Sequence, residues 1–330
     1  HTIARREHGG TTIGGMAPVT SWIFPGQGSQ SVGMGAEAFA TSPAARAVLG
    51  EAEAALGSPL GDLIANGPSE ALERTDRAQP AILVVSIALL AAARERAAAQ
   101  GAVLDTPVRI AGHSAGQYAA AVAAGAIQLV DAVRLARRRG ELMQASTGTR
   151  AGAMAAILGL PAEAEDGVVA AGAARGILVL ANRNSPGQIV LSGEVDAIDA
   201  AISAAGDAGA KRAVRLPVSI ASHSPLMEEA AAGMRLALDE VAVRDPRVPM
   251  LANADAAPIT TADQLKAELS NHLTSGVDWI AAVGAMAGAG TTRFVEVGPG
   301  RVLSGLVKRI PQARDAEVLG VDDLFAAAAA

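Results

Sequence analysis

The sequence predicts an α/β protein in which a parallel sheet flanked by helices is interrupted by an inserted ferredoxin-like subdomain. Short apolar runs alternate with Ala- and Leu-rich helical segments through most of the 330 residues, and this order is typical of a parallel sheet. From about residue 149 to 216 the order changes to strand, helix, strand, strand, helix, strand, which is the ferredoxin-like order. We therefore expect a large unit formed by residues 16–148 and 217–330, with a small unit, residues 149–216, inserted between its halves.

The expected elements follow from apolar periodicity and from turn residues. Pro80 suits the first turn of a helix, and Asp131 suits an N-cap because its side chain can accept a hydrogen bond from a free amide. In the large unit we expect strands at residues 21–24, 108–111, 249–253 and 293–297, and helices at residues 36–56, 81–99, 115–124, 131–144, 227–243, 261–272, 278–289 and after the Gly-Pro turn at 298–300. In the small unit we expect strands at residues 152–159, 177–180, 188–191 and 213–216, and helices at residues 163–173 and 196–206.

Composition limits both the core and the range of functions. Hydrophobic residues make up 50% of the chain but aromatic residues only 2%, so the core must be built from Ala, Val, Leu and Ile. The formal net charge is −6 and no basic domain appears, which argues against a nucleic-acid partner. With zero cysteines there are no disulfides and no Cys metal sites, which fits a reducing compartment, and we expect a cytoplasmic location. No apolar run reaches membrane-spanning length without a charge, Gly or Pro, so we expect no membrane partner.

Both ends of the sequence look like additions to the fold. Residues 1–15 lack periodicity and precede Met16, so we expect a tag remnant or a disordered leader there. Arg5 and Arg6 are not followed by an apolar region, which argues against a targeting signal. The alanine run after Phe325 is either a frayed helix or a cloning scar.

A G-x-S-x-G pattern, Gly112-His113-Ser114-Ala115-Gly116, lies where a buried strand passes into a helix. On such a turn the serine hydroxyl is pushed into the open, and a Cβ at either glycine would clash with neighbouring backbone. The amide of Ala115 lies at the helix N-terminus, where free N–H groups stabilise developing negative charge. These features predict a nucleophilic serine for acyl transfer within a hydrolase-like sheet. A Gly-rich turn with a bystander serine is the alternative, and the pentapeptide alone does not separate the two.

Five histidines limit the choice of a general base. Two lie in the expected leader, and His113 precedes the serine on a tight turn, where neighbouring side chains point apart. His223 and His272 remain as candidates, and folding rather than sequence distance decides which lies within hydrogen-bond reach of the nucleophile. His223 lies in a Ser-His-Ser-Pro turn that opens a helix, where a satisfied turn histidine is the alternative role.

Two further segments carry functional signals. The loop of residues 25–30, Pro-Gly-Gln-Gly-Ser-Gln, follows a strand and is rich in backbone amides, as loops that line active sites often are. It lacks the Lys-Ser/Thr of a Walker phosphate loop, so we discount nucleotide binding. The helix from Asp131 carries consecutive arginines at residues 137–139, and since each step rotates about 100°, at least one must face inward. We expect Arg137 and Arg138 on the solvated face.

Six segments resemble the malonyl-CoA:acyl carrier protein transacylase family, which includes the acyltransferases of polyketide synthases. They are FPGQGSQ at residues 24–30, GHSAG at 112–116, RRRGELM at 137–143, NSPGQ at 184–188, PVSIASHSPLM at 217–227 and EVGPGRVL at 296–303. They occur in the order and spacing of the family from about residue 20 to 310. Six ordered motifs are far more specific than the G-x-S-x-G pattern alone.

The resemblance implies a role for the matching residues. Ser114 attacks a thioester and carries the acyl group, while His223 takes the serine proton and returns it to the leaving thiol. In this family no carboxylate stands behind the histidine; a backbone carbonyl orients it, and here that carbonyl falls at His272. The amides of Gln27 and Ala115 hold the oxyanion.

Arg139 is implied to be the arginine that faces inward, where its fork suits a bidentate grip on the free carboxylate of a malonyl group. A related acyl-hydrolase branch lacks this arginine, so its presence argues against simple deacylation. We expect three further residues to line the substrate pocket, namely Ser222, Asn184 and His113.

The implied activity moves a malonyl or substituted malonyl group from coenzyme A to the phosphopantetheine thiol of an acyl carrier protein, in fatty-acid or polyketide synthesis. Donor and acceptor carry the same arm, so one pocket can serve each in turn, as a ping-pong scheme requires. No metal or other cofactor is implied. Because the carrier protein is acidic, we expect a basic rim, although ordinary solvated charges are the alternative for each member. The candidates are Lys211, Arg212, Arg215, Lys308 and Arg309.

The sequence departs from the family at two positions. Ala115 stands where a bulkier residue is usual, and Gln117 stands where Glu is usual. The small Ala115 leaves room for a larger branched extender unit, and Ser222 gives a weaker signal in the same direction. Two rival functions remain open. A serine acyl hydrolase or thioesterase with the same elbow predicts a carboxylate partner for the base, and a carrier-protein docking module predicts an inert serine.

Overall fold

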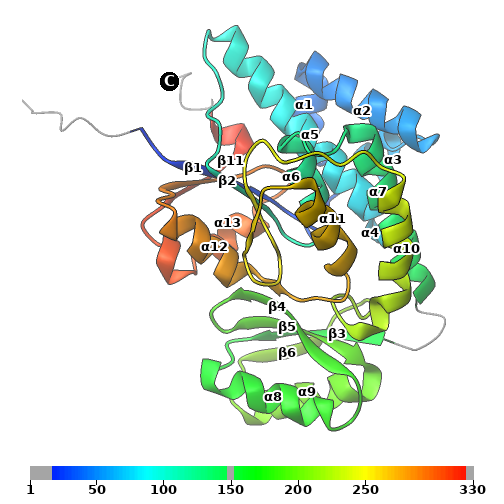
Figure 1. Ribbon diagram of the computed structural model, residues 1–330. Coiled ribbons are helices and arrows are strands. Elements are labelled where there is room, and N and C mark those ends of the chain that lie inside the picture. The colour runs from blue at the N-terminus through cyan, green and yellow to red at the C-terminus, as the bar shows by residue number, and fades with distance from the viewer. Residues whose placement is uncertain (1–16, 147–151, 325–330) are drawn as a thin grey trace, which may run out of the picture.

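Two sheets organise residues 17–146 and 152–324, the part of the chain that the computed structural model describes (Figure 1). The predicted leader at residues 1–15, the junction at residue 149 and the alanine tail after Phe325 lie outside the described residues. The larger sheet and its helices form the upper body in Figure 1, and the smaller sheet lies below it.

The large sheet is mostly parallel. Its six strands span Thr20–Phe24 (β1), Arg109–Gly112 (β2), Met250–Leu251 (β7), Pro258–Ile259 (β8), Arg293–Glu296 (β10) and Glu317–Gly320 (β11). They lie in the order β11-β10-β1-β2-β7-β8, and only the pair β7–β8 is antiparallel among the pairs of this sheet in the described residues. The predicted α/β class is therefore confirmed, although β7 is shorter than expected and the edge strands β8 and β11 are not predicted by the sequence.

Both faces of the central strands are buried. Trp22 and Phe24 of β1 belong to one core cluster, whereas Ile23 between them belongs to a second cluster on the opposite face. Because both faces pack against helices, the strands are continuous apolar runs rather than alternating polar and apolar patterns.

Helices cover the two faces unequally (Figure 1). The first core cluster contains side chains from α1 (Ala36–Thr41), α2 (Pro43–Leu56), α3 (Gly61–Asn66), α4 (Ser69–Glu73), α5 (Thr75–Ala99), α6 (Gly116–Ala123), α7 (Leu129–Ala145), α10 (Glu228–Asp239) and α11 (Ala262–Asn271). The second contains side chains from α12 (Trp279–Gly288) and α13 (Val302–Val307). Residues 78–90 of α5 are all buried, so this part of the helix is covered on all sides and forms the centre of the first layer.

Four helix boundaries differ from the predictions. The helix expected at residues 36–56 is two helices, because Pro43 starts a new one and the Ser42 side chain caps it by accepting from the Ala45 amide at 3.1 Å. Helix α5 begins at Thr75 rather than near Pro80, so the proline lies inside the helix. Helix α10 ends at Asp239, short of the expected residue 243.

Helix α7 begins two residues before Asp131, with Gln128 at the N-cap position. The prediction that Asp131 is the N-cap is therefore wrong. Its carboxylate lies instead in the first turn, where it still interacts favourably with the helix dipole.

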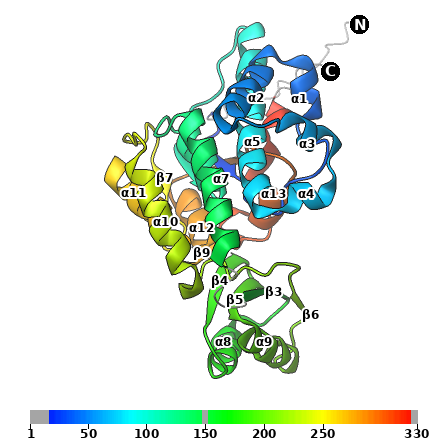
Figure 2. The same cartoon turned by 90° about the vertical axis from the view of Figure 1, so that its right-hand side faces the viewer.

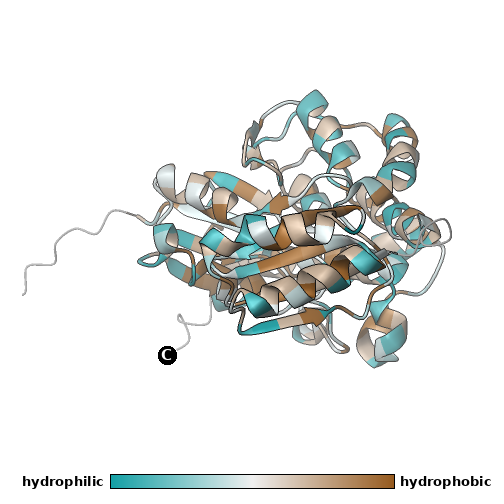
Figure 3. Ribbon diagram, turned by 90° about the horizontal axis from the view of Figure 1, so that it is seen from below, coloured by the Kyte–Doolittle hydropathy of each residue, from teal (hydrophilic) through white to brown (hydrophobic). Residues whose placement is uncertain are grey.

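The small sheet contains the predicted order of elements. They are β3 (Gly152–Leu158), α8 (Glu165–Ala173), β4 (Leu178–Ser185), β5 (Gln188–Glu194), α9 (Val195–Asp207) and β6 (Arg212–Arg215). The strand order is β6-β3-β5-β4, and α8 and α9 pack on one face, which lies outermost in Figure 2. Viewed from that side, the helices carry both teal and brown residues and the strands behind them are mainly brown (Figure 3).

Strand β4 is longer than predicted and pairs with a strand from the second half of the chain. It continues through Asn182 and Asn184, which were expected in a loop, so only the Pro186-Gly187 turn separates it from β5. Its outer edge pairs in parallel with β9 (Val277–Asp278), a strand from the second half of the large unit. This pairing fixes the small sheet against the segment that leads into α12.

Candidate active site

Ser114 lies on a tight turn between β2 and α6. Its φ is 50°, in the left-handed region that residues with a Cβ rarely adopt. A Cβ on Gly112 would collide with the backbone of Gly116 and Gln117, and one on Gly116 would collide with the carbonyl of Phe24. The two glycines are therefore required by close backbone approach, as the sequence predicts, and the serine hydroxyl faces a cavity.

His223 reaches the serine from a turn more than 100 residues later. Ser114 Oγ and His223 Nε2 lie 2.8 Å apart. On the other side of the ring, Nδ1 lies 2.7 Å from the carbonyl oxygen of His272 and 2.8 Å from that of Ser275. Since carbonyls only accept, the proton lies on Nδ1 and the lone pair of Nε2 faces the serine hydroxyl, which is the tautomer that a general base requires.

Among the described residues, no carboxylate contacts Nδ1 of His223. Both partners of this nitrogen are backbone carbonyls. The His223 side chain is buried, and burial together with the positive charge of Arg139 lowers its pKa to about 4. The imidazole is therefore neutral at physiological pH and able to accept a proton.

Arg139 of α7 points inward and is only 1% exposed. Its Nη2 donates to Ser114 Oγ at 3.2 Å, its Nη1 to Gln79 Oε1 at 2.8 Å and its Nε to His272 Nε2 at 3.0 Å. All three acceptors are uncharged, and within residues 17–146 and 152–324 the guanidinium forms no ion pair. Burial lowers its pKa to about 10, so it remains a cation beside the nucleophile without a counter-ion.

The neighbouring arginines behave differently. Arg138 is exposed, as expected, and lies 3.7 Å from Glu141. Arg137 is half-buried rather than fully solvated, because its Nη1 donates to the Leu56 carbonyl at 3.3 Å while its Nε pairs with Glu141 at 3.3 Å.

The loop after β1 packs directly on the elbow. A Cβ on Gly26 would collide with the carbonyl of His113 and would lie 3.6 Å from the amide nitrogen of Ala115. In the described part of the chain, neither the Gln27 amide nor the Ala115 amide donates a hydrogen bond to another protein group. Two free donors thus lie on adjoining loops beside Ser114.

A cavity of about 460 Å³ opens over these groups, between the large sheet and the small one. Eight of the nine predicted site residues line it, and the ninth, His272, lies behind Arg139 and His223. The eight are Gln27, His113, Ser114, Ala115, Arg139, Asn184, Ser222 and His223. Its apolar wall comes from Met143, Met154, Val190, Leu216, Val218 and Ile220.

His113 and Asn184 form one polar corner of this cavity. His113 Nε2 donates to Asn184 Oδ1 at 2.9 Å, which ties the elbow to β4 of the small sheet. The ring also lies against Trp279, with centroids 5.4 Å apart. Burial lowers the pKa of His113, so this corner is neutral.

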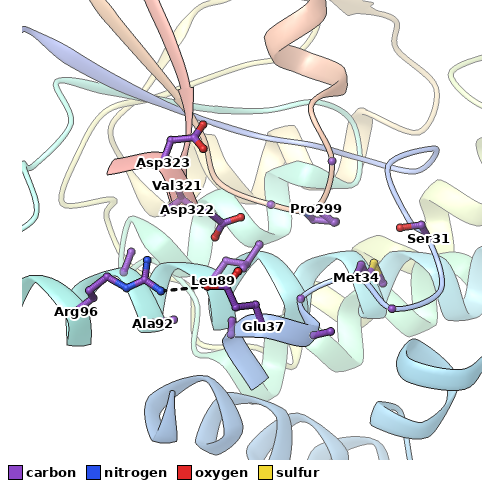
Figure 4. Close-up of a pocket in the computed structure, with 17 residues that line it drawn as sticks. Ser31, Met34, Glu37, Leu89, Ala92, Arg96, Pro299, Val321, Asp322 and Asp323 are labelled. Atoms are coloured by element: carbon purple, nitrogen blue, oxygen red, sulfur yellow. Dashed lines mark ion pairs between the residues drawn. The ribbon is translucent and has the colours of Figure 1, made fainter. Parts of the chain in front are cut away.

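A second cavity, of about 440 Å³, lies between α1, α5 and the residues after β11 (Figure 4). Three of its four charged side chains form ion pairs with protein groups, Arg96 with Glu37 at 3.7 Å and Asp323 with Arg301 at 3.1 Å. None of the predicted site residues lines it, and it shares no lining residue with the cavity over Ser114. We therefore assign the chemistry to the cavity over Ser114.

Sequence reasoning missed four residues that support the site. Gln79 lies in the first turns of α5, before the helix that the sequence predicts at residues 81–99, and the sequence marks Gln117 only as a departure from the family pattern. Asn253, which follows β7, contacts the elbow, and Glu268 of α11 contacts Asn253 and Gln117. The usable signal for Asn253 was its place at the carboxyl end of a parallel strand, where site residues gather.

The described residues contain no candidate metal site and no candidate membrane-spanning helix. Across residues 17–146 and 152–324 no group of three or more His, Cys, Asp or Glu side chains is arranged to hold a metal ion. The helices of the same residues include none with the length and apolarity needed to span a membrane.

Comparison with known proteins agrees with this geometry. The family model for the acyl transferase domain matches residues 21–321. The malonyl CoA-acyl carrier protein transacylase of Escherichia coli O157:H7 is 41% identical over 309 residues, which cover 93% of this chain and 98% of that protein. The protein of the same name from Bacillus subtilis (strain 168) is 43% identical over 291 residues, which cover 88% of this chain and 90% of that protein.

Solved structures agree as well. An acyl carrier protein S-malonyltransferase from Vibrio cholerae is 38% identical, with a TM-score of 0.85 over 92% of this chain and 96% of that chain. A malonyl-transacylase in complex with a type II PKS acyl-carrier protein is 36% identical, with a TM-score of 0.84 over 91% and 94% of the two chains. The protein whose Ser114, His223 and Arg139 meet in one cavity therefore belongs to the acyl transferase family, in the group that includes the malonyl-CoA:acyl carrier protein transacylases.

Proposed function

We propose that this enzyme moves a malonyl group from coenzyme A to the phosphopantetheine thiol of an acyl carrier protein, through an acyl-enzyme formed on Ser114. The observation that carries the proposal is the buried guanidinium of Arg139, 3.2 Å from Ser114 Oγ and without an acidic partner in the described residues. An acyl group that brings its own carboxylate would supply the missing negative charge. The names of the relatives in Escherichia coli and Bacillus subtilis support the same substrate and acceptor.

In the first half-reaction, Ser114 Oγ attacks the carbonyl carbon of the malonyl thioester while His223 Nε2 accepts the hydroxyl proton. The new C–O bond produces a tetrahedral oxyanion, which the free amides of Gln27 and Ala115 stabilise. The C–S bond then breaks, and the imidazolium returns its proton to the departing thiolate of coenzyme A. The carbonyls of His272 and Ser275 hold the Nδ1 proton throughout.

The second half-reaction reverses these steps with another thiol. His223 accepts the proton of the phosphopantetheine thiol, whose sulfur attacks the Ser114 ester, and the oxyanion forms again between the same two amides. When the C–O bond breaks, the proton on His223 returns to Ser114 Oγ. Donor and acceptor use one cavity in turn, which gives ping-pong kinetics.

Arg139 provides selectivity for dicarboxylic acyl groups. At a separation of about 4 Å and an effective dielectric constant near 20, a unit charge pair is worth about 4 kcal/mol. A planar guanidinium also matches the two oxygens of a carboxylate. A monocarboxylic acyl group would leave this charge unpaired in a buried site, so acetyl transfer should be slow.

A substituted malonyl group is the second candidate substrate. The wall next to the nucleophile is apolar, with Met143, Met154 and Ile220, and Ala115 occupies little space there. These residues favour room for an alkyl substituent on the acyl group. Comparing turnover of malonyl-, methylmalonyl- and ethylmalonyl-CoA tests this candidate, and strict use of malonyl-CoA would exclude it.

The acceptor is expected to approach over exposed basic residues of the small unit and of the segment after α13. Arg309, just after α13, donates to Gln188 Oε1 of β5 at 3.0 Å, while Lys211 and Arg212 are exposed at β6. Opposite charge on an acidic carrier protein would guide its approach. The small unit of residues 149–216 would then contribute both a cavity wall and part of the docking surface.

Intact-mass measurement tests the proposal directly. The protein mixed with malonyl-CoA should gain one malonyl group, Ser114→Ala should gain none, and added holo-carrier protein should remove the group and become malonylated. A serine hydrolase would release free malonate without carrier protein, and a docking module would show no adduct. Either of these results would contradict the proposal.

A further inference from the structure

The backbone of the Ser114 elbow is held by the side chain of Asn253, which follows β7 and is 4% exposed. The Ser114 amide donates to Asn253 Oδ1 at 2.8 Å, and Asn253 Nδ2 donates to the Gly112 carbonyl at 2.9 Å. One carboxamide therefore binds the chain both at the nucleophile and two residues before it. Because the φ of Ser114 is positive, this conformation needs such support from its surroundings.

The position of Asn253 depends in turn on Glu268 of α11. Glu268 Oε1 accepts from the Asn253 amide at 2.9 Å and from Gln117 Nε2 at 3.0 Å. Gln117 is fully buried; its Nε2 also donates to the Leu251 carbonyl at 2.8 Å, and its Oε1 accepts from the Gly112 amide at 3.3 Å. Glu268 thus joins α11 to two segments that hold the elbow.

The same turn of α11 leads to the support of the base. The His272 amide donates to the Glu268 carbonyl at 2.9 Å, and the His272 carbonyl accepts from His223 Nδ1 at 2.7 Å. One turn of α11 therefore connects Glu268, which contacts the supports of the Ser114 backbone, to the His272 carbonyl, which orients His223.

Building on the proposed function, we propose that Glu268 is a positioning residue, whose carboxylate fixes Asn253 and Gln117 and thereby sets Ser114 at its working distance from His223. Glu268 does not line the cavity and touches no reacting atom. Its two donors, an amide N–H and a carboxamide, are uncharged, so its role here is that of a shared hydrogen-bond acceptor. Small displacements of a nucleophile can lower a rate by about 10²-fold.

The test compares Glu268→Ala and Glu268→Gln with Asp263→Asn, a matched control that changes an exposed carboxylate in the first turn of the same helix. Single-turnover malonylation of Ser114 is followed by intact mass, together with KM for malonyl-CoA and thermal unfolding. Glu268→Ala should slow acylation at saturating malonyl-CoA about tenfold or more. KM should stay unchanged because Arg139 keeps its contacts. Glu268→Gln retains an acceptor oxygen and should keep most of the rate, and Asp263→Asn should match the wild type.

A charge exchange gives a second, independent readout. Gln117→Glu places a carboxylate against Glu268 and the Leu251 carbonyl, and should slow acylation more than Glu268→Gln does. In the double variant Gln117→Glu with Glu268→Gln, the carboxamide at position 268 can donate to the carboxylate at position 117. This double variant should therefore recover part of the acylation rate. This exchange also decides the question if Glu268→Ala does not fold.

Two results would overturn the inference. The first is that Glu268→Ala acylates Ser114 as fast as the wild type. The second is that Glu268→Ala loses acylation rate, malonyl-CoA affinity and stability together, and that neither Glu268→Gln nor the double exchange avoids this loss. If the wild-type protein forms no malonyl adduct, the proposed function fails and this inference with it. A normal wild-type adduct with an unaffected Glu268→Ala variant contradicts the positioning role alone.

Discussion

Arg139 Nε donates to His272 Nε2 at 3.0 Å, while the carbonyl of the same His272 accepts from His223 Nδ1 at 2.7 Å. One residue thus contacts Arg139, the proposed carboxylate-binding group, with its ring, and His223, the proposed general base, with its backbone. Burial and the nearby charge of Arg139 lower the pKa of His272 well below its usual value, so its ring stays neutral and able to accept.

His272→Leu should therefore separate substrate selection from chemistry. The backbone carbonyl remains, so His223 keeps its orientation. Arg139 loses one hydrogen-bond acceptor, so the position of its guanidinium is less well defined. We expect kcat/KM for malonyl-CoA to fall about tenfold, with little change for acetyl-CoA. His272→Gln, which retains an acceptor, is the matched control. An equal fall in kcat/KM for malonyl-CoA and acetyl-CoA would show that the His272 ring supports the whole site and not only the Arg139 guanidinium.

Arg139→Ala should abolish the preference for a dicarboxylic acyl group. Loss of the buried cation should lower kcat/KM for malonyl-CoA by about 10²- to 10³-fold and leave acetyl transfer unchanged or faster. Arg138→Ala, on the exposed face of the same helix, should behave as the wild type. Unimpaired malonyl transfer by Arg139→Ala would remove the main support for the proposed substrate.

Activity should persist to unusually low pH. The base works only when His223 is neutral, and burial and Arg139 lower its pKa to about 4. The acylation rate with acetyl-CoA should therefore be constant near neutral pH and fall only as the pH drops through about 4, since protonation then removes the acceptor. In Arg139→Ala the repulsive charge is gone, so the acid limb should move to higher pH. A wild-type limb near the ordinary histidine pKa of about 6.5 would contradict this assignment.

Much of this site was predictable because its residues carry local signals. The rotation of about 100° per helical residue already required one of three consecutive arginines to face inward, and the strand-to-helix turn required both glycines around Ser114. The assignment of His223 needed the resemblance to a family, because its distance from Ser114 along the chain says nothing about folding.

The supports behind the site were not predictable in the same way. Asn253 lies 139 residues from Ser114, and it reaches the elbow only because β7 pairs with β2. The two-residue strand β9, which adds the segment before α12 to the edge of the small sheet, is too short to leave an apolar pattern. Pro80 marked the wrong helix start because α5 already begins at Thr75 and continues through the proline, despite the backbone hydrogen bond that a proline removes.

Glu296 should matter for stability rather than for catalysis. It is fully buried at the end of β10, where Oε1 accepts from the Leu303 amide at 3.0 Å and Oε2 accepts from the Ser304 amide at 2.8 Å and the Ser304 hydroxyl at 2.6 Å. It thereby satisfies free amides at the start of α13. Glu296→Ala should lower the free energy of unfolding by about 3 kcal/mol, because buried donors lose their acceptor. Denaturant unfolding measures this, with the exposed Glu51→Ala as control; equal midpoints for the two variants would refute it.

Carrier-protein affinity should depend on the exposed basic residues at β6. Lys211 and Arg212 have no ion-pair partner in the described residues, whereas Arg215 is neutralised by Asp199. The double substitution Lys211→Glu with Arg212→Glu should raise KM for an acidic carrier protein severalfold, and more at low ionic strength, because steering by exposed charges is screened by salt. Malonylation of Ser114 by malonyl-CoA alone should be unchanged, since neither residue lines the cavity. The control for the same change of net charge is the double substitution Arg46→Glu with Arg134→Glu, at exposed basic residues of α2 and α7 whose guanidiniums contact backbone carbonyls. If this control raises KM equally, overall charge rather than a docking rim governs the encounter, and the residues at β6 are ordinary solvated charges.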